Sequence, residues 1–521
     1  METAPVMDMA KDKYFNGHSS SLHPDLYRHP PEFDSSRRRS TMHSYTLSCY
    51  HTIPTDMSTM RTVRQMTGTR ALKNVIFLGL AFMFVYTAFV SLLSLQSSMH
   101  WEGGAGVASL SCIYGTTVLS CLLAPWLISK LSPKWTMVIA FILFTGYFAG
   151  NFYPEHSILM PLAVILGLLA GPLWSSQATT ITTIALTHAE HSHIADQDAV
   201  INKFMGIFCG LYRSSYIWGN LITTLVFSDN QTLTGSDVTG NFTSRVCGAS
   251  DCKLQMMGES DYEWEVGSLL TSVSDNTKYM LLSIYLGCGV MGTVILISLV
   301  DNNIGSKSAE AEFSLSSKEL FLSTLKMLTD FKCQLLMLLV LFVGLEQGFM
   351  FGDFTRSYVS CTLGVQSLGP ILMCFGAVSA ISSVAIGYVG RHIKRFAFVT
   401  AGATFNSGLL IVLWLWRPFP TDIPNFFVVA SCLGLCDAIW QTQTQTLFGV
   451  LFVDKQEAAF ASYRMFYATG CAIAFGYSYF LCVETKVYIL AGVLLISLLL
   501  YSVIEMKVQL QSQHIKDIVA L

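Results

Sequence analysis

The chain has 521 residues, of which 52% are hydrophobic and only 12% are charged. Soluble globular domains carry about 25% charged residues, so this composition excludes a soluble protein and indicates a polytopic protein embedded in the lipid bilayer. The formal net charge is -3 and no domain is basic, so the sequence gives no support for a nucleic-acid partner.

Residues 1–73 form a polar amino-terminal tail without sustained hydrophobic periodicity. Such a composition is typical of a disordered segment, here expected in the cytoplasm. Ser40, in SSRRRS, is a candidate phosphorylation site for a basophilic kinase, although similar clusters are equally common in unmodified tails. The basic residues at 61–73 are expected to keep this end inside and to contact anionic lipid.

Twelve apolar segments follow the tail, each long enough to cross a bilayer as a helix. The even number of crossings and the excess of Lys and Arg in the inner loops place both termini in the cytoplasm. We expect a first six-helix half at 74–300, a cytoplasmic linker at 301–332, a second half at 333–506 and a cytoplasmic tail at 507–521. The expected segments are 74–95, 106–128, 136–153, 158–186, 204–228, 279–300, 333–354, 365–389, 396–415, 425–450, 458–481 and 485–506.

One long outer loop, at 229–277, carries its own topology signals. It contains glycosylation sequons at Asn230 and Asn241, which require exposure to the lumen to be used. It also contains Cys247 and Cys252, which are expected to close a small disulfide ring on the oxidising side of the membrane. The loop has no histidine, so it offers too few ligands for a zinc site.

The two halves of the chain resemble each other in sequence. GVASL begins the second segment and GVQSL begins the eighth. WSSQATT, with Trp174 and Gln177, ends the fourth segment, and WQTQTQT, with Trp440 and Gln443, occupies the same place in the tenth. Matches in the same order at nearly the same offset predict two parallel six-helix repeats, the arrangement of major-facilitator proteins.

The tenth segment carries polar residues where lipid-facing helices are apolar. Asp437, Gln441 and Gln445 are four residues apart and therefore lie on one helical face. Inserting a carboxylate at mid-membrane costs about 2.5–3.5 kcal/mol, so this face is expected toward a cavity, a bundle interior or a partner. Interhelical hydrogen bonding without a further role is the alternative, particularly for the glutamines.

A central cavity is predicted from the repeat, because the first, fourth, seventh and tenth helices line it in major-facilitator folds. These helices would bring together Tyr86, Gln177, Glu346 and Asp437. Arg213 of the fifth segment is expected as a buried counter-charge, either in a structural pair with a carboxylate or in ligand binding. The eleventh segment begins near Glu457 and Arg464, and both are expected to snorkel to the membrane interface.

Signals for an enzyme are missing from the sequence. Neither a phosphate-binding glycine loop nor the metalloprotease or serine-hydrolase motifs occur in a usable context, so no catalytic residue and no cofactor are expected. Three histidines cluster in THAEHSH, but a solvated inner loop is a better explanation than a metal site that lacks a closing ligand set.

Several stretches together resemble the uncoordinated-ninety-three (Unc-93-like) family, in particular its homolog A branch. The resemblance extends over residues 72–505, nearly everything except the tails. Its main stretches are LQSSMHWEGGAGVASLSCIYG, GPLWSSQAT, THAE, GNLITTLVF, CGASDC, TRSYVSCTLGVQ, DAIWQTQTQTLFGVLF, EAAFASYR and AFGYSYFLCV. The resemblance implies a major-facilitator-like fold of twelve helices.

The family also implies function. Its nematode founder is a regulatory subunit of a two-pore-domain potassium channel in muscle, and another branch is a trafficking partner of Toll-like receptors. We therefore expect an accessory subunit of a potassium channel complex in excitable or epithelial cells. The alternatives are a secondary transporter of a small solute or ion and a trafficking chaperone for receptors.

The second-to-third loop bears on the choice between these functions. It reads LISKLSPKWTM and lacks the glycine–aspartate–arginine motif that gates transport in sugar and drug transporters, which favours the accessory subunit. The plasma membrane is the expected location, with endosomes or the endoplasmic reticulum as alternatives.

Overall fold

The computed structural model describes residues 66–99, 105–153, 155–228, 247–252, 275–302, 317–477 and 481–520. Every regular element in these ranges is a helix. Ser40, Asn230 and Asn241 lie outside the described residues, so their modification remains a prediction.

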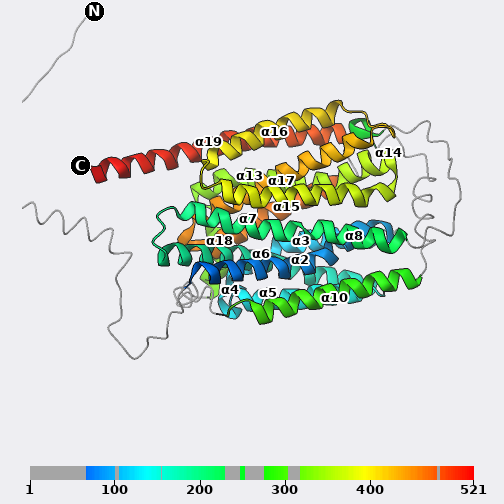
Figure 1. The fold of residues 1–521 in the computed structure, drawn as a ribbon, viewed down its shortest axis with the longest axis horizontal. Helices are drawn as coiled ribbons and strands as arrows, with labels where there is room; N and C mark the ends of the chain where they lie inside the picture. Colours follow the sequence, from blue (N-terminus) through cyan, green and yellow to red (C-terminus); the bar gives the residue numbers. More distant parts are fainter. Residues whose placement is uncertain are drawn as a thin grey trace, which may run out of the picture. The chain divides into compact units, whose positions relative to one another are not determined.

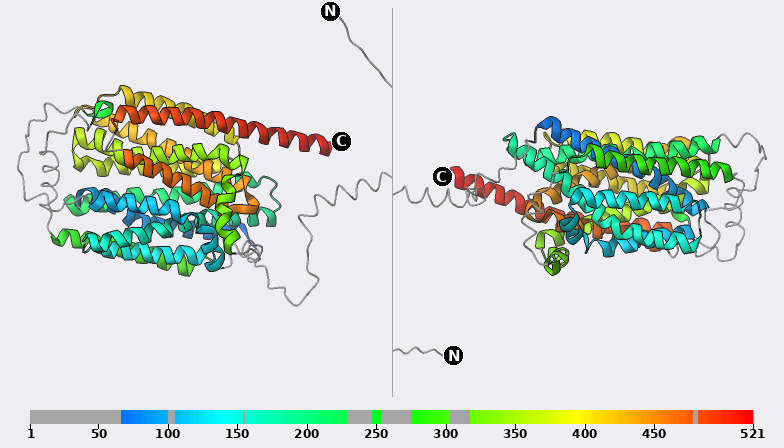
Figure 2. Two further views of the ribbon diagram at one scale, coloured as in Figure 1. Left: turned by 180° about the vertical axis from the view of Figure 1, so that it is seen from behind. Right: turned by 90° about the horizontal axis from the view of Figure 1, so that it is seen from below.

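The elements up to residue 302 come from the expected first half, and most run side by side along one direction (Figures 1 and 2). They are α2 (Gly68–Met99), α3 (Ala105–Ser120), α4 (Ala124–Leu131), α5 (Pro133–Gly150), α6 (His156–His191), α7 (Gln197–Arg213), α8 (Ser215–Ser228), η3 (Gly248–Ser250) and α10 (Asp275–Leu299).

The elements from residue 317 onward come from the linker and the expected second half. They are α12 (Ser317–Leu328), α13 (Phe331–Phe349), the π-helix η5 (Met350–Ser360), α14 (Cys361–Leu363), η6 (Val365–Ser367), α15 (Leu368–Val389), α16 (Arg395–Leu415), α17 (Ile423–Leu451), η7 (Val453–Lys455), α18 (Gln456–Tyr477) and α19 (Val483–Ala520). The carboxyl-terminal end of α19 extends past its neighbours in Figure 1.

Eight described helices are long and apolar enough to cross a membrane, or nine if a bent pair counts as one span. That pair is Cys112–Ser120 with Ala124–Leu131, bent by 71°. The second helix of the pair begins at Ala124 and has Pro125 in its first turn, where the missing N–H of proline is tolerated, unlike in a helix interior. The expected fifth segment is likewise divided at Ser214, into α7 and α8.

Buried apolar side chains form two large clusters that follow the order of the chain. One is built from residues between Met66 and Val300, and the other from residues between Met327 and Ile504 together with Ala178. Most helices therefore pack with neighbours from their own part of the chain, whereas α15 also packs closely against α7 and α8.

Asn202 of α7 links the two clusters through hydrogen bonds. Its amide nitrogen donates to the carbonyl of Ile386 on α15 (3.1 Å), and its amide oxygen accepts from Gln443 Nε2 on α17 (3.0 Å). A buried amide with satisfied donors and acceptors fixes how helices meet, because a shift would leave polar groups unpaired.

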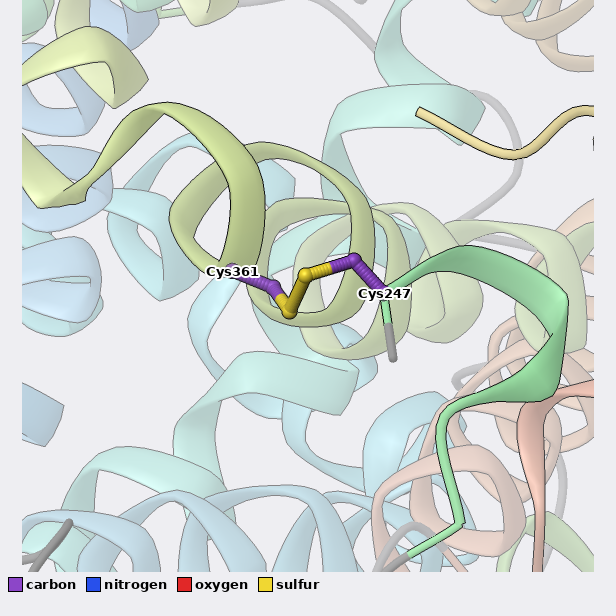
Figure 3. The surroundings of a disulfide bond; sticks show 2 residues. All are labelled: Cys247 and Cys361. Carbon is purple, nitrogen blue, oxygen red and sulfur yellow. A yellow bond between two sulfur atoms is a disulfide. The ribbon is translucent and has the colours of Figure 1, made fainter. Parts of the chain in front are cut away.

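The disulfides differ from the expected small ring, which is wrong. Cys247 pairs with Cys361, with 5.8 Å between the Cα atoms (Figure 3), and Cys252 pairs with Cys482, with 4.3 Å. The intervening turn η3 lies against Pro418, near Gly248. The five-residue spacing of Cys247 and Cys252 is compatible with a small ring. It does not show, however, that Cys361 and Cys482, which are 114 and 230 residues further along the chain, lie at the same end of the bundle.

Candidate functional site

The polar face of α17 is buried, as its spacing predicted. Gln445 Nε2 donates to Gln441 Oε1 (3.2 Å), and the hydroxyl of Tyr463 on α18 donates to the same oxygen (3.4 Å). Asp437 is only 7% exposed. This face therefore packs against other helices, where the two glutamines bond to each other and to Tyr463 and lipid would provide no such partners.

Asp437 forms a buried ion pair with Arg213, as the sequence suggested. The Arg213 Nη2–Asp437 Oδ1 distance is 2.8 Å, and Ser379 Oγ of α15 donates to Oδ2 (2.8 Å). Arg213 Nη1 also lies 3.4 Å from the hydroxyl of Tyr216. Both carboxylate oxygens thus have partners, the condition under which a buried pair offsets its desolvation. The contacts join α7, α15 and α17.

Two of the other predicted residues lie in different surroundings. Glu346 of α13 accepts a hydrogen bond from the amide of Asn406 on α16, a partner the sequence analysis did not identify. Tyr86 of α2 packs edge-on against Trp174 and Tyr212, with ring centroids 5.1 and 5.0 Å apart. Tyr86 is therefore part of an aromatic cluster, whereas Glu346 connects its own helix, α13, with α16.

Arg464 does not snorkel to the interface, so that expectation is wrong. The residue is 8% exposed, and its guanidinium carbon lies over the rings of Trp174 (4.2 Å) and Tyr467 (4.7 Å). Its Nε has no hydrogen-bond partner, and within the described ranges no carboxylate pairs with it. Glu457, also expected at the interface, is 3% exposed.

Gln177 provides unpartnered polar atoms on the same helix as Trp174, whose ring contacts this arginine. It lies on α6 one turn after Trp174, it is fully buried, and neither its amide oxygen nor its amide nitrogen has a hydrogen-bond partner among the described residues. Gln443, its counterpart in the sequence repeat, is bonded to Asn202. A buried amide without partners costs free energy, so Gln177 is an unusual residue for a helix interior.

The two arginines occupy the same position in a motif that the sequence analysis missed. Tyr-Arg-x-x-Tyr-x-x-Gly occurs at 212–219 and again at 463–470. Both final glycines let backbones meet: a Cβ on Gly219 would collide with α2, and one on Gly470 would collide with α13. In each case the partner is the first long helix of the same apolar cluster.

A second buried ion pair lies near the disulfides. Lys486 Nζ of α19 is 2.6 Å from Asp353 Oδ1 of η5, and both side chains have 0% exposure. Arg356 is 3.9 Å from the same carboxylate oxygen. Sequence analysis did not identify this pair; the available signal was Asp353, a further carboxylate two turns after Glu346.

No group of three His, Cys, Asp or Glu side chains that could hold a metal occurs among the residues whose positions are described. The buried charges are instead arginines, lysines and carboxylates on different helices. These groups can pair, bind an ion of opposite charge, or hold helices together.

Two solved structures have a similar arrangement of helices. The Escherichia coli fucose:proton symporter, FucP, matches with a TM-score of 0.53 and 14% identity, covering 82% of this chain and 96% of that one. A FucP structure in the outward conformation, described as a major facilitator superfamily transporter, gives 0.51 and 12%, with the same coverage. The all-helical fold is therefore of the major-facilitator type.

Sequence relatives cover most of the chain. Protein unc-93 homolog A is 40% identical in Bos taurus, over 83% of this chain and 93% of that protein, and 39% identical in Homo sapiens, over 84% and 93%. The Caenorhabditis elegans "Putative potassium channel regulatory protein unc-93" is 28% identical over 84% of this chain and 61% of its own length. The family described as "Ion channel regulatory protein UNC-93" matches residues 98–501. The chain therefore belongs to the UNC-93 family of multi-pass membrane proteins.

Proposed function

We propose that this protein is a regulatory subunit of a potassium channel complex in the plasma membrane of excitable or epithelial cells. The description of its family and the name of its nematode relative, which both refer to channel regulation, support this function. The protein would then act through contacts with channel subunits, without moving a solute itself.

The Arg213–Asp437 ion pair is the structural observation that carries the proposal. It connects helices of the two apolar clusters, and both carboxylate oxygens have partners. Separating such a pair leaves a buried charge uncompensated, at a cost of about 3–5 kcal/mol. One fixed arrangement of the helices, as an accessory subunit requires, is therefore favoured over repeated separation of the clusters.

The proposal includes twelve membrane spans in two six-helix repeats, with both termini in the cytoplasm. The repeated motif supports it, because Gly219 packs against α2 and Gly470 against α13, helices that begin the two halves. The halves would be 74–300 and 333–506, with cytoplasmic segments 1–73, 301–332 and 507–521. Glycosylation at Asn230 and Asn241 tests this topology: the band shift on glycosidase treatment should disappear when both are changed to Gln.

The functional test is co-expression with potassium channel subunits. The protein should co-purify with a channel and change its current. Asp437→Asn should reduce surface abundance and the change in current together, because the ion pair has a structural role. Asp454→Asn, a change in the short helix η7, serves as the control. Normal abundance of Asp437→Asn with the current effect lost would contradict a purely structural pair.

A secondary transporter is the second candidate, because the fold resembles a proton-coupled symporter and Arg464 pairs with no carboxylate among the described residues. In that case solute flux should occur in liposomes that contain only this protein. Absence of flux together with altered channel current would decide for the regulatory subunit.

A further inference from the structure

We propose that Arg464 and Gln177 bind the carboxylate group of an organic anion between α6 and α18. This inference goes beyond the role in channel regulation and does not depend on it. A bound anion could adjust a regulatory subunit or be carried by a transporter, and the chemistry of recognition is the same in both cases.

The surroundings of the guanidinium group favour a carboxylate ligand. Its central carbon lies 4.2 Å from the ring centroid of Trp174 and 4.7 Å from that of Tyr467, and aromatic rings offer its N–H donors no strong hydrogen-bond acceptor. Nε is without a partner. A carboxylate can accept from Nε and one Nη at once in the parallel, two-bond geometry that Arg forms with carboxylates.

The charge of Arg464 calls for a counter-ion. Removing a cation from water costs several kcal/mol, and a cation–π contact contributes about 2 kcal/mol when desolvated. In the described part of the chain the residue has aromatic neighbours but no ion pair. An anion from outside the chain would supply the missing negative charge.

Gln177 adds a second, independent observation. Its two amide atoms are unpartnered and fully buried, and the residue follows Trp174 by one turn of α6, on the same side of that helix. Its N–H groups can donate to a carboxylate, and its oxygen can accept from a hydroxyl or amino group of the same ligand. The pair of residues thus offers donors to the acid and an acceptor to a neighbouring group.

The other copy of the motif shows how such a site is completed. Arg213 is bound by Asp437, which stands three residues before Trp440. Three residues before Trp174 stands Gly171, so α6 cannot supply the equivalent carboxylate. A free carboxylate on Arg464 would reproduce in one half the interaction that the chain makes for itself in the other.

The test measures binding to the full-length protein, purified in detergent without a channel. Benzoate represents soluble carboxylates, oleate represents fatty acids, and sulfate at matched ionic strength controls for salt. At least one carboxylate should raise the Tm in a saturable way, while sulfate should not. A response to benzoate assigns a soluble acid, and a response to oleate alone assigns a fatty acid.

Substitutions at Arg464 and Gln177 show whether the ligand-induced rise in Tm comes from binding at these two residues. Arg464→Lys keeps the charge but loses the two-bond geometry and should weaken binding about tenfold or more; Arg464→Gln should remove it. Gln177→Leu should weaken binding without lowering the Tm of the ligand-free protein, because its amide has no partner to lose. Arg417→Gln, at an exposed arginine, should bind like the native protein.

Absence of a saturable response in the native protein, or an undiminished response in both Arg464 variants, would overturn the proposal. Arg464→Lys and Gln177→Leu keep the test decisive if Arg464→Gln does not fold. Channel current is measured separately, so a failure of this proposal is distinguishable from a failure of the proposed function.

Discussion

The two copies of the Tyr-Arg-x-x-Tyr-x-x-Gly motif place the same residues in different electrostatic surroundings. Arg213 in the first copy has a carboxylate at 2.8 Å, whereas Arg464 in the second lies over Trp174 and Tyr467 and has an unpartnered Nε. Their burial is similar and their tyrosine neighbours are equivalent. The role of a buried arginine is therefore set by the helix opposite it and not by its own motif.

The packing of α6 explains why the second arginine lacks a carboxylate. A Cβ on Gly171 would lie 2.5 Å from Ser120 Oγ at the end of α3 and 2.9 Å from the backbone nitrogen of Cys121 in the following turn, so this part of the chain leaves no room for a side chain there. At the corresponding point of α17 the chain carries Asp437, whose carboxylate reaches both Arg213 and Ser379. The same position of the sequence repeat therefore allows close helix contact where it is glycine, as at Gly171, and holds a buried acid where it is aspartate, as at Asp437.

Breaking the Arg213–Asp437 pair should have the largest effect on stability. Arg213→Gln leaves Asp437 buried without its cation, and the free energy of unfolding should fall by about 3–5 kcal/mol. Asp437→Asn should act similarly, while the double variant should lose less than the sum of the two. Thermal unfolding in detergent and surface abundance measure this; strictly additive losses would show that the two side chains do not interact.

The ion pair of Lys486 and Asp353 extends the comparison to another cation of the second half. Lys486→Met should destabilise the protein, but by less than the ~3–5 kcal/mol expected for an isolated buried pair, because Arg356 lies 3.9 Å from the same carboxylate. Combining this change with Arg356→Gln should increase the loss. Equal Tm values for the single and double variants would mean that Arg356 offers no compensation.

Sequence analysis identified the interactions that arise from charges in the middle of apolar segments. Asp437 and Arg213 were recognisable because lipid disfavours both, and their opposite charges suggested a pair. Arg464 was misplaced because it lies only a few residues after the start of its segment, where snorkelling is common. The repeated motif was present in the sequence and would have related the two arginines.

Contacts between distant parts of the chain were beyond that analysis. Cys361 and Cys482 lie at the edges of apolar segments, and nothing in their spacing connects them with Cys247 and Cys252. The breaks at Ser214 and before Pro125 depend on how neighbouring helices pack, although the proline was a local signal. Fold class follows from hydropathy, but side-chain partners require the three-dimensional arrangement.

The ion pair of Arg70 and Asp301, outside the apolar interior, should have a smaller and pH-dependent effect. Burial raises the pKa of Asp301, but hydrogen bonds from Asn74 (2.9 Å) and Arg70 (2.7 Å) outweigh it, so the pKa lies below its usual value. Its contribution is therefore present at neutral pH and is lost as the pH falls through the lowered pKa of the folded state. Partial exposure limits it to about 1 kcal/mol.

Asp301→Asn should accordingly lower the Tm slightly at pH 7, and the difference from the native protein should shrink toward pH 3.5. Unfolding curves at pH 7, 5 and 3.5 measure both effects. A difference that grows on acidification would have the wrong sign for a carboxylate with a lowered pKa.

Arg464→Gln in the absence of ligand should have the smallest effect, and its sign distinguishes it from Arg213→Gln. It removes a buried cation that pairs with no carboxylate in the part of the chain that the structure describes, so the desolvation cost of that charge disappears together with contacts to two aromatic rings. Loss of the desolvation cost stabilises the variant and loss of the ring contacts destabilises it, so the Tm should stay the same or rise. The same substitution at the first copy of the motif should lower it by several degrees. Parallel unfolding of both variants, after extensive washing in carboxylate-free buffer, makes the comparison. An equal loss of Tm at the two positions would show that the second arginine is as firmly partnered as the first.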